Sequence, residues 1–250
     1  MKTGIEKHLL HIENLSYHYE NDEPVLKNIN IDVNQGESIG VIGTNGVGKS
    51  TLLKLLVGLL LDYDGTLEVV NHPMIRENVN HIREHIGYVF QDSDNQLFMT
   101  TVGEDVAFGP INYGLPQDEV NRRVDEALRL THIEHLRDKH VYKLSGGEKK
   151  LASIATILSM EPDIILMDEP SVALDPQNRR HLINLLNDLA PMKIIASHDL
   201  DFVLDTCDRV VLLYEGEIIA DGPADEILRD KELLESHGLE LPIRYYYQEI

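Results

Sequence analysis

The stretch GTNGVGKST, Gly43–Thr51, has the spacing G-x-x-x-x-G-K-[ST] and lies between a short apolar run and a predicted helix. This is the setting of a P-loop, in which glycines let backbone N–H groups close around phosphate oxygens. We expect Lys49 to reach the β- and γ-phosphates and the Ser50 hydroxyl to bind Mg²⁺. The predicted nucleotide-binding residues are Gly43, Thr44, Asn45, Gly46, Val47, Gly48, Lys49, Ser50 and Thr51.

Apolar runs and helical patterns around this loop predict an α/β fold. Four runs are typical of buried strands in a parallel sheet, at residues 38–42, 86–90, 163–167 and 193–197. Helices are predicted, the last two with proline at their start, over residues 50–60, 117–130, 146–160, 176–189 and 223–237. Residues 209–222 predict a hairpin that turns near Glu215 and Gly216, and the first 35 residues predict an antiparallel strand region. Together they indicate a P-loop NTPase (RecA-like) core with a mainly parallel sheet.

The region from residue 93 to residue 160 contains only helical patterns. We therefore predict a helical subdomain inserted between two strands of the sheet. In this interpretation residues 1–240 form a single domain, whose nucleotide-binding core comprises residues 1–92 and 161–240. Residues 241–250 are a C-terminal tail.

Composition narrows the possible partners. The chain has 43 acidic and 22 basic residues, a net charge of −21, which argues against binding nucleic acid or anionic lipid. The single cysteine, Cys207, excludes an internal disulfide and suits a reducing compartment. The N-terminal residues lack the apolar stretch of a signal peptide, and no apolar run approaches the ~20 residues that span a bilayer. We expect a soluble chain, or one that docks on a membrane-spanning partner.

Polar residues follow the predicted strands at the edge where ligands bind in open parallel sheets. Asp168 is a predicted Mg²⁺ ligand, and Glu169 is placed to take a proton from the attacking water. Gln91 and His198 are neutral groups suited to sensing the γ-phosphate, and Gln91 is also a predicted metal ligand. A single glutamine at a strand end is usually a solvated loop residue, and a lone histidine is more often structural. Their convergence with Gly43 and the two acids indicates a catalytic site for nucleotide hydrolysis, with Lys49, Gln91, Glu169 and His198 as catalytic residues.

A second glycine pair begins a predicted helix in LSGGE, Leu144–Glu148. The spacing from Ser145 to Glu148 fits a capping box, in which the two side chains satisfy the first N–H groups of the helix. The segment Thr101–Glu104, TVGE, fits the same pattern. Capping and anion binding use the same donors, so both interpretations of LSGGE remain open at this point.

In the order of its motifs, the chain resembles the ATP-binding cassette (ABC) ATPases over about residues 5–235. These motifs are GTNGVGKST, Gln91, LSGGE, IILMDE, the loop Ser171–Asp175 and Ser197-His198-Asp199. In that family LSGGE faces the P-loop of a second subunit, with ATP between them. The resemblance therefore implies ATP and Mg²⁺ as cofactors. It also implies an adenine-stacking role for Tyr19, with Tyr17 the second candidate and core packing the alternative for either. It assigns trans ATP contacts to Ser145, Gly146, Gly147 and Glu148, and a D-loop to Ala173, Leu174 and Asp175.

A closer resemblance lies in DNQLF and EDVAFGP, with PADEIL and ESHGLELP near the end, which are similar to the ATPases of energy-coupling-factor importers. It implies an ATPase that energises uptake of transition-metal ions or vitamins. Such a subunit is peripheral, on the cytoplasmic face of the inner membrane. Its partners are a second ATPase subunit, identical or paralogous, and an integral membrane scaffold. Arginine-bearing scaffold helices dock beside the loop after Gln91 in that family. The acids expected to pair with them, if not merely solvated, are Asp92, Asp94, Glu104 and Asp105.

Two other functions are compatible with parts of this pattern. One is a soluble, non-transport ABC ATPase that acts in DNA repair or translation. The other is a nonhydrolytic nucleotide switch, against which Glu169 argues. The chain departs from the family at Leu151, where arginine is common, and in the C-terminal RYYYQEI, which is either a tail or an interface strip.

Overall fold

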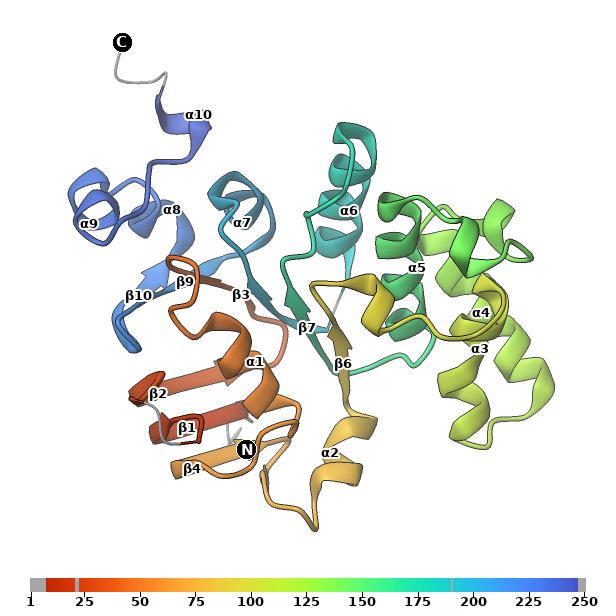
Figure 1. Ribbon diagram of the computed structural model, residues 1–250, viewed down its shortest axis with the longest axis horizontal. Helices are drawn as coiled ribbons and strands as arrows, with labels where there is room; N and C mark the ends of the chain where they lie inside the picture. The colour runs from red at the N-terminus through yellow and green to blue at the C-terminus, as the bar shows by residue number, and fades with distance from the viewer. Residues whose placement is uncertain (1–7, 21–22, 190, 247–250) are drawn as a thin grey trace, which may run out of the picture. The chain divides into compact units, whose positions relative to one another are not determined.

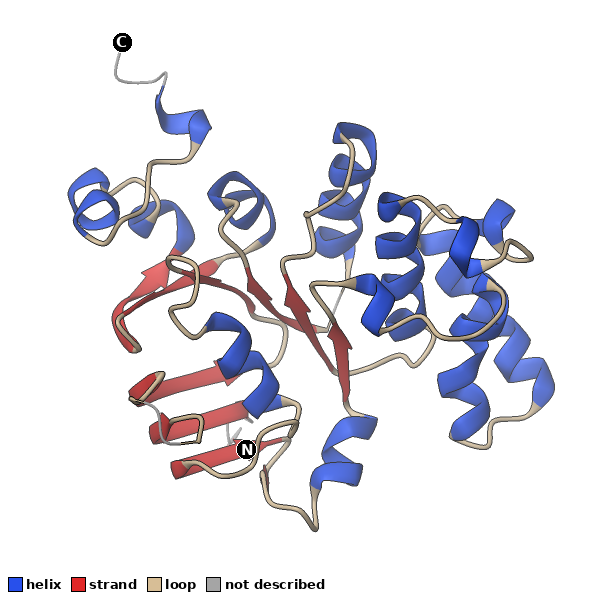
Figure 2. Cartoon of the chain, viewed as in Figure 1, coloured by secondary structure: helices blue, strands red, loops and turns tan. Residues whose placement is uncertain are grey.

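The computed structural model describes residues 8–20, 23–189 and 191–246. Contacts divide the chain into two units, one formed by residues 1–86 with 190–250 and the other by residues 87–189. Figure 1 traces the chain through its elements, and Figure 2 separates helices from strands. The two units are described in turn.

The first unit contains an antiparallel sheet in the order β2-β1-β4-β5. Its strands are β1 (His8–Tyr17), β2 (Leu26–Asn34), β4 (Asp64–Val69) and β5 (His72–Pro73). Buried and exposed residues alternate along most of β2, because successive side chains of a strand point to opposite faces. The antiparallel region predicted near the N-terminus is confirmed for the described residues.

Four further strands of this unit lie in the order β10-β9-β3-β8. They are β3 (Ser38–Ile42), β8 (Met192–Ala196), β9 (Arg209–Tyr214) and β10 (Glu217–Pro223). β3 pairs in parallel with both β8 and β9, and every residue of β3 and β8 is buried. The predicted hairpin is confirmed, because Glu215 and Gly216 both have positive φ between β9 and β10.

The helices of the first unit are short. They are α1 (Lys49–Leu56), α2 (Val79–Glu84), α7 (Leu200–Thr206), α8 (Ala224–Ile227), α9 (Lys231–Ser236) and α10 (Ile243–Tyr246). The single helix predicted over residues 223–237 is wrong, because Asp230 accepts the backbone N–H of Leu233 and caps a new helix there. Pro223 precedes the first turn of α8.

The start of the RYYYQEI segment is helical and docked. Asp201 of α7 accepts the backbone N–H groups of Ile243 and Arg244 in α10, and the Arg244 guanidinium pairs with Asp205. The predicted tail is therefore held to α7 as far as it is described, and residues 247–250 lie outside the described part.

The second unit contains two neighbouring strands, β6 (Ile86–Val89), which starts at its boundary, and β7 (Ile164–Asp168). Its helices are α3 (Val102–Asn112), α4 (Gln117–Leu130), α5 (Gly146–Leu158) and α6 (Pro176–Asp188), with 3₁₀ turns η1 (Ser93–Asn95), η2 (Glu134–Leu136) and η3 (Val141–Lys143). Between residues 93 and 158 every named element is helical, with one isolated bridge between Thr101 and His140. The sequence pattern predicted the cap of α3 but not its extent, because Gly109 and Pro110, which are unfavourable inside a helix, lie within its C-terminal half.

Candidate functional site

The P-loop follows β3 directly and ends in the first turn of α1. Gly48 has φ +114, and a Cβ there would lie 2.8 Å from Leu26 Cδ2 and 3.1 Å from the carbonyl oxygen of Val25. Only glycine fits this close approach without strain. The Lys49 ammonium is buried and donates to the carbonyl oxygens of Gly43 at 2.8 Å and Thr44 at 3.0 Å, so it lies within the curl of the loop. A glycine-rich turn that leads into a helix N-terminus, with a lysine inside it, is suited to bind phosphate.

Two predicted residues of the first unit lie close to this loop. The Tyr19 hydroxyl is 3.1 Å from Thr51 Oγ1, and its ring is half-buried. Tyr17 is buried and meets Tyr19 edge-on at 5.0 Å, so packing explains Tyr17, and Tyr19 is the aromatic residue beside the loop. His198 follows β8, in which Ala196 pairs with Val41 of β3. The chain therefore leaves both strands at the same edge, toward Gly43 from one and toward His198 from the other.

The two predicted carboxylates lie at the end of β7. Asp168 is its last residue and Glu169 follows, with exposures of only 4% and 5%. Glu169 has φ +47, a left-handed conformation that costs a residue with a Cβ roughly 1–2 kcal/mol. Backbone strain of this kind is concentrated at functional sites. The arrangement holds an acidic side chain in a defined position directly after a buried strand.

Gln91 lies in an exposed loop that is tied to α5 through a residue the sequence patterns did not identify. Lys150 is 2% exposed, and its ammonium donates to the carbonyl oxygens of Phe90 at 2.9 Å and Gln91 at 2.8 Å. Burial lowers the pKa of Lys150, and the nearby carboxylate of Asp168 opposes that shift. The signal in the sequence is a lysine next to Leu151 and four residues before Ile154, on the side of the helix that carries apolar residues. Leu151, where the family commonly has arginine, is buried in the core.

The LSGGE segment forms the predicted capping box at the start of α5. The Ser145 hydroxyl accepts the backbone N–H of Glu148 at 3.3 Å, and the Glu148 carboxylate accepts the backbone N–H of Ser145 at 2.7 Å. Lys139 pairs with Glu148 at 2.8 Å and holds the pKa of that carboxyl below its usual range. The capping interpretation is confirmed, and the TVGE box at Thr101 is confirmed in the same way.

The second unit brings several predicted segments together around a cleft of about 390 Å³. A Cβ on Gly147 would lie 3.3 Å from the carbonyl oxygen of Ala173, so the glycines of LSGGE lie against the predicted D-loop. Asp175 ends that loop and caps α6 by accepting two backbone N–H groups. The residues that line the cleft come from the Gln91 loop, α5 and the D-loop: Gln91, Asp92, Ser93, Asp94, Gly146, Lys149, Lys150, Val172 and Ala173.

The acids expected to receive scaffold arginines have internal partners. Asp105 is 3% exposed and accepts the backbone N–H groups of Phe98 and Met99 at 3.1 Å, so its assignment to a surface pairing is wrong, and it is not a solvated loop acid either. Burial raises the pKa of the Asp105 carboxyl. The others also act locally, since Asp92 caps η1, Asp94 pairs with Lys149 at 2.5 Å, and Glu104 belongs to the capping box of α3.

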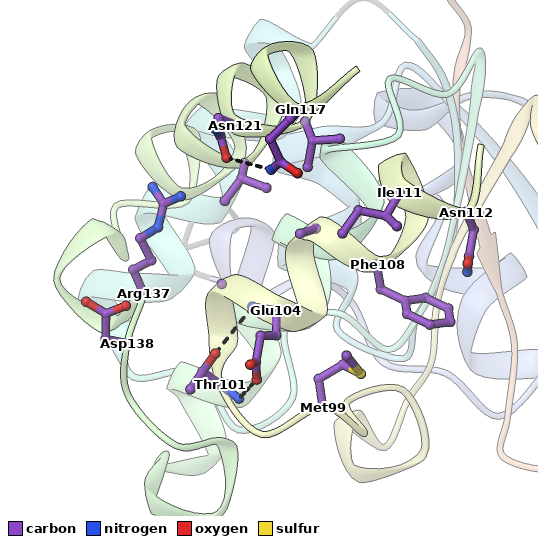
Figure 3. Close-up of a pocket in the computed structure, with 14 residues that line it drawn as sticks. Met99, Thr101, Glu104, Phe108, Ile111, Asn112, Gln117, Asn121, Arg137 and Asp138 are labelled. Atoms are coloured by element: carbon purple, nitrogen blue, oxygen red, sulfur yellow. Dashed lines mark hydrogen bonds between the residues drawn. The ribbon is translucent and has the colours of Figure 1, made fainter. Parts of the chain in front are cut away.

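A groove of about 500 Å³ lies on the helical part of the second unit, lined mainly by α3 and α4 (Figure 3). Phe108 and Ile111 of α3 line it and are 38% and 55% exposed. Phe98, which is 64% exposed, meets Phe108 edge-on at 4.7 Å. Large exposed apolar side chains that cluster in this way mark an interaction surface.

Two negative findings apply to the described residues alone. Among them, no helix combines the length and apolar character needed to cross a membrane. Within the same residues, no group of three or more His, Cys, Asp and Glu side chains is arranged to hold a metal ion.

A phosphate-binding loop after a buried parallel strand, with an acidic pair at another strand end, defines a P-loop nucleotide-binding protein. A family model for ABC transporters matches residues 26–172. The chain belongs to this family, and it is an ATP-binding ATPase of it. The predicted resemblance and fold class are thereby confirmed.

Relatives and solved structures give the same result over nearly the whole chain. The energy-coupling factor transporter ATP-binding protein EcfA3 of Clostridium perfringens is 42% identical over 244 residues, 95% of this chain and 86% of that protein. The structure of cbiO1 from Clostridium perfringens, part of the ABC transporter complex cbiONQ, matches with a TM-score of 0.83 and 41% identity, covering 98% of this chain and 100% of that one. A dimeric ATP-binding cassette bound to ADP and Pi matches with a TM-score of 0.78 and 26% identity, over 86% of this chain and 98% of that one.

Proposed function

We propose that this chain is the ATP-hydrolysing subunit of an energy-coupling-factor importer for transition-metal ions or vitamins. The observation that carries the proposal is the similarity, over 95% of this chain, to an ATP-binding protein of such a transporter. In this role the protein is peripheral, on the cytoplasmic face of the inner membrane. The nucleotide-binding core and the helical subdomain proposed from the sequence, residues 1–92 with 161–240 and residues 93–160, form one ATPase domain.

The proposed chemistry assigns one task to each group. The P-loop N–H groups and Lys49 bind the phosphates, and Tyr19 stacks on the adenine. Glu169 takes the proton from the attacking water, while Gln91 and His198 contact the γ-phosphate region. The backbone conformation that holds the buried Glu169 in place supports its assignment as the general base.

Mg²⁺ suits the donors available in this chain. The ion prefers oxygen ligands and is usually held by one or two carboxylates together with substrate phosphates. Ser50, Gln91 and Asp168 supply a hydroxyl, an amide oxygen and a carboxylate. When bound, the ion neutralises charge on the phosphates.

A second ATPase subunit completes the proposed site. Ser145, Gly146, Gly147 and Glu148 contact the ATP of the partner subunit in this proposal, and the D-loop residues Ala173, Leu174 and Asp175 lie beside them. Packing of the LSGGE glycines against Ala173 supports a single surface formed by both segments. The capping hydrogen bonds between Ser145 and Glu148 fix the start of α5 even when no phosphate is bound there.

We assign docking of the integral membrane scaffold to the groove between α3 and α4. The binding surface is apolar, because Phe108 and Ile111 are exposed in the groove and the exposed Phe98 packs against Phe108 beside it, while Asp105 is buried. Asp105 still contributes, since its two backbone hydrogen bonds fix the segment that presents Phe98. Apolar anchors in a groove are the usual source of binding energy for a docked helix.

The experiment is copurification of Phe98→Glu with membrane partners from the cell that makes this protein. We expect the variant to lose a multispanning protein that the wild-type chain retains, and to keep its ATPase activity in isolation. Ile219→Glu is the control, because Ile219 is also an exposed apolar residue, 40% exposed, and belongs to β10 in the other unit. If neither wild type nor control retains a membrane protein, the importer assignment is wrong and the soluble non-transport ATPase replaces it.

A further inference from the structure

One side chain of α5 holds the loop that carries Gln91. Lys150 lies in the second turn of α5, shortly after the LSGGE segment. Its ammonium donates to the carbonyl oxygens of Phe90 and Gln91, at 2.9 Å and 2.8 Å. Both acceptors belong to the backbone that leaves β6. The contact therefore joins the helix that begins at LSGGE directly to the residue proposed to contact the γ-phosphate region.

The burial of this cation is costly unless it is compensated. Lys150 is 2% exposed, and removing an ammonium from water is strongly unfavourable unless hydrogen bonds and opposite charges offset the lost hydration. Two backbone carbonyls supply the hydrogen bonds, and the carboxylates of Asp168, Asp92 and Glu169 favour the charged form. An apolar side chain of similar length would fill the position without that cost. The physical effect specific to the lysine is the fixed position of the two carbonyls.

Other contacts hold the far part of the loop to the same helix. The Gln96 amide donates to Ser153 of α5, and Lys149 pairs with Asp94. Among the hydrogen bonds between α5 and this loop in the described residues, those of Lys150 are the ones that reach Gln91 itself. Fixing Gln91 is therefore separable from fixing the rest of the loop.

We propose that Lys150 is a positioning residue that fixes Gln91 relative to the LSGGE helix, so that Gln91 and LSGGE move as one body during the ATPase cycle. The inference rests on the proposed function, in which Gln91 acts at one ATP and LSGGE at the ATP of the partner subunit. Misplacing a catalytic group by about 1 Å costs roughly 10²-fold in rate. A rigid link between the two segments would couple the ATP site that Gln91 contacts to the ATP site that LSGGE contacts.

The first test is Lys150→Met in the full-length chain, with kcat and KM measured separately. We expect kcat to fall about 10- to 100-fold with KM for ATP nearly unchanged, since the P-loop residues are untouched. Lys150→Arg keeps the charge and several N–H donors and should recover part of kcat. Lys149→Met is the matched control. Lys149 itself forms an ion pair with the exposed Asp94, and pairs of this kind contribute little to stability.

The second test asks whether Lys150 acts through Gln91. Gln91→Ala is combined with Lys150→Met, because residues that act as a unit show non-additive effects. We expect the double variant to hydrolyse ATP at about the rate of Gln91→Ala alone. Multiplied effects would overturn the proposal, as would a wild-type kcat in Lys150→Met. Should Lys150→Met fail to fold, Lys150→Gln, which keeps two N–H donors without the charge, replaces it in the cycle.

Glu169→Gln separates this inference from the proposed function. If Glu169→Gln is inactive while Lys150→Met has a wild-type kcat, the inference alone is wrong. If Glu169→Gln also retains the wild-type rate, the assignment of the hydrolytic site is wrong, and the positioning role of Lys150 is overturned with it.

Discussion

Gln96 gives a quantitative test of how the loop after β6 is held. Its side-chain amide donates to the Ser153 carbonyl at 2.7 Å and the Thr156 hydroxyl at 2.9 Å, and its amide oxygen accepts the backbone N–H of Phe90 at 3.2 Å. Each intramolecular hydrogen bond contributes about 1 kcal/mol net, so Gln96→Ala should lower the free energy of unfolding by about 3 kcal/mol. For a chain of this size that is a fall in Tm of roughly 6–12 °C.

The assay is thermal unfolding followed by circular dichroism, because the chain contains no tryptophan for fluorescence. Gln117→Ala is the control, since Gln117 is exposed and its side chain makes a single hydrogen bond, to Asn121 at 3.2 Å. It should change the free energy of unfolding by less than about 0.5 kcal/mol. If Gln96→Ala behaves like this control, the two bonds to α5 and the one within the loop do not hold the loop in place, and the argument that Gln96 connects it rigidly to α5 is refuted.

Three further predictions concern the site and its surroundings. Glu169→Gln should lower kcat about 10²- to 10⁴-fold and accumulate as an ATP-bound dimer on size exclusion. Lys49→Ala, in contrast, should neither bind ATP well nor dimerise. A wild-type rate in Glu169→Gln would mean that the general base is another residue, with His198 as the next candidate. A mixture of Lys49→Ala and Gly147→Asp subunits, each inactive alone, should regain ATPase activity, because every mixed dimer keeps one intact composite site. If mixed dimers are shown to form and activity does not return, the result counts against composite sites. Burial raises the pKa of Asp105 in the folded chain, so its contribution to stability is largest at low pH and falls as pH rises through the folded-state pKa. The Tm of Asp105→Asn relative to wild type should therefore improve from pH 4 to pH 7.5 in thermal melts, and a pH-independent difference would contradict that sign.

The sequence by itself determined the features that depend on neighbouring residues. The P-loop spacing, both capping boxes, the buried strands β3 and β8 and the hairpin between β9 and β10 all follow from patterns a few residues long. Local chemistry sets these features, because a cap or a turn is complete within four or five residues. The break before α9 is equally local, because Asp230 caps that helix, but the surrounding helical pattern masks this capping signal.

Only the tertiary structure decided which polar residues are buried and what they hold. Asp105 belongs to an acidic segment whose sequence predicts exposure to solvent. In the structure it is buried and accepts hydrogen bonds from the backbone N–H groups of Phe98 and Met99. Lys150 bonds to carbonyls 59 and 60 residues away in the chain, and Gln96 bonds to Ser153, 57 residues away. Hydrophobic periodicity identifies a helix and its apolar face, but it does not specify which distant backbone packs against a given polar side chain. The burial of that side chain depends on this packing, because a polar group leaves water only where another segment supplies its hydrogen bonds.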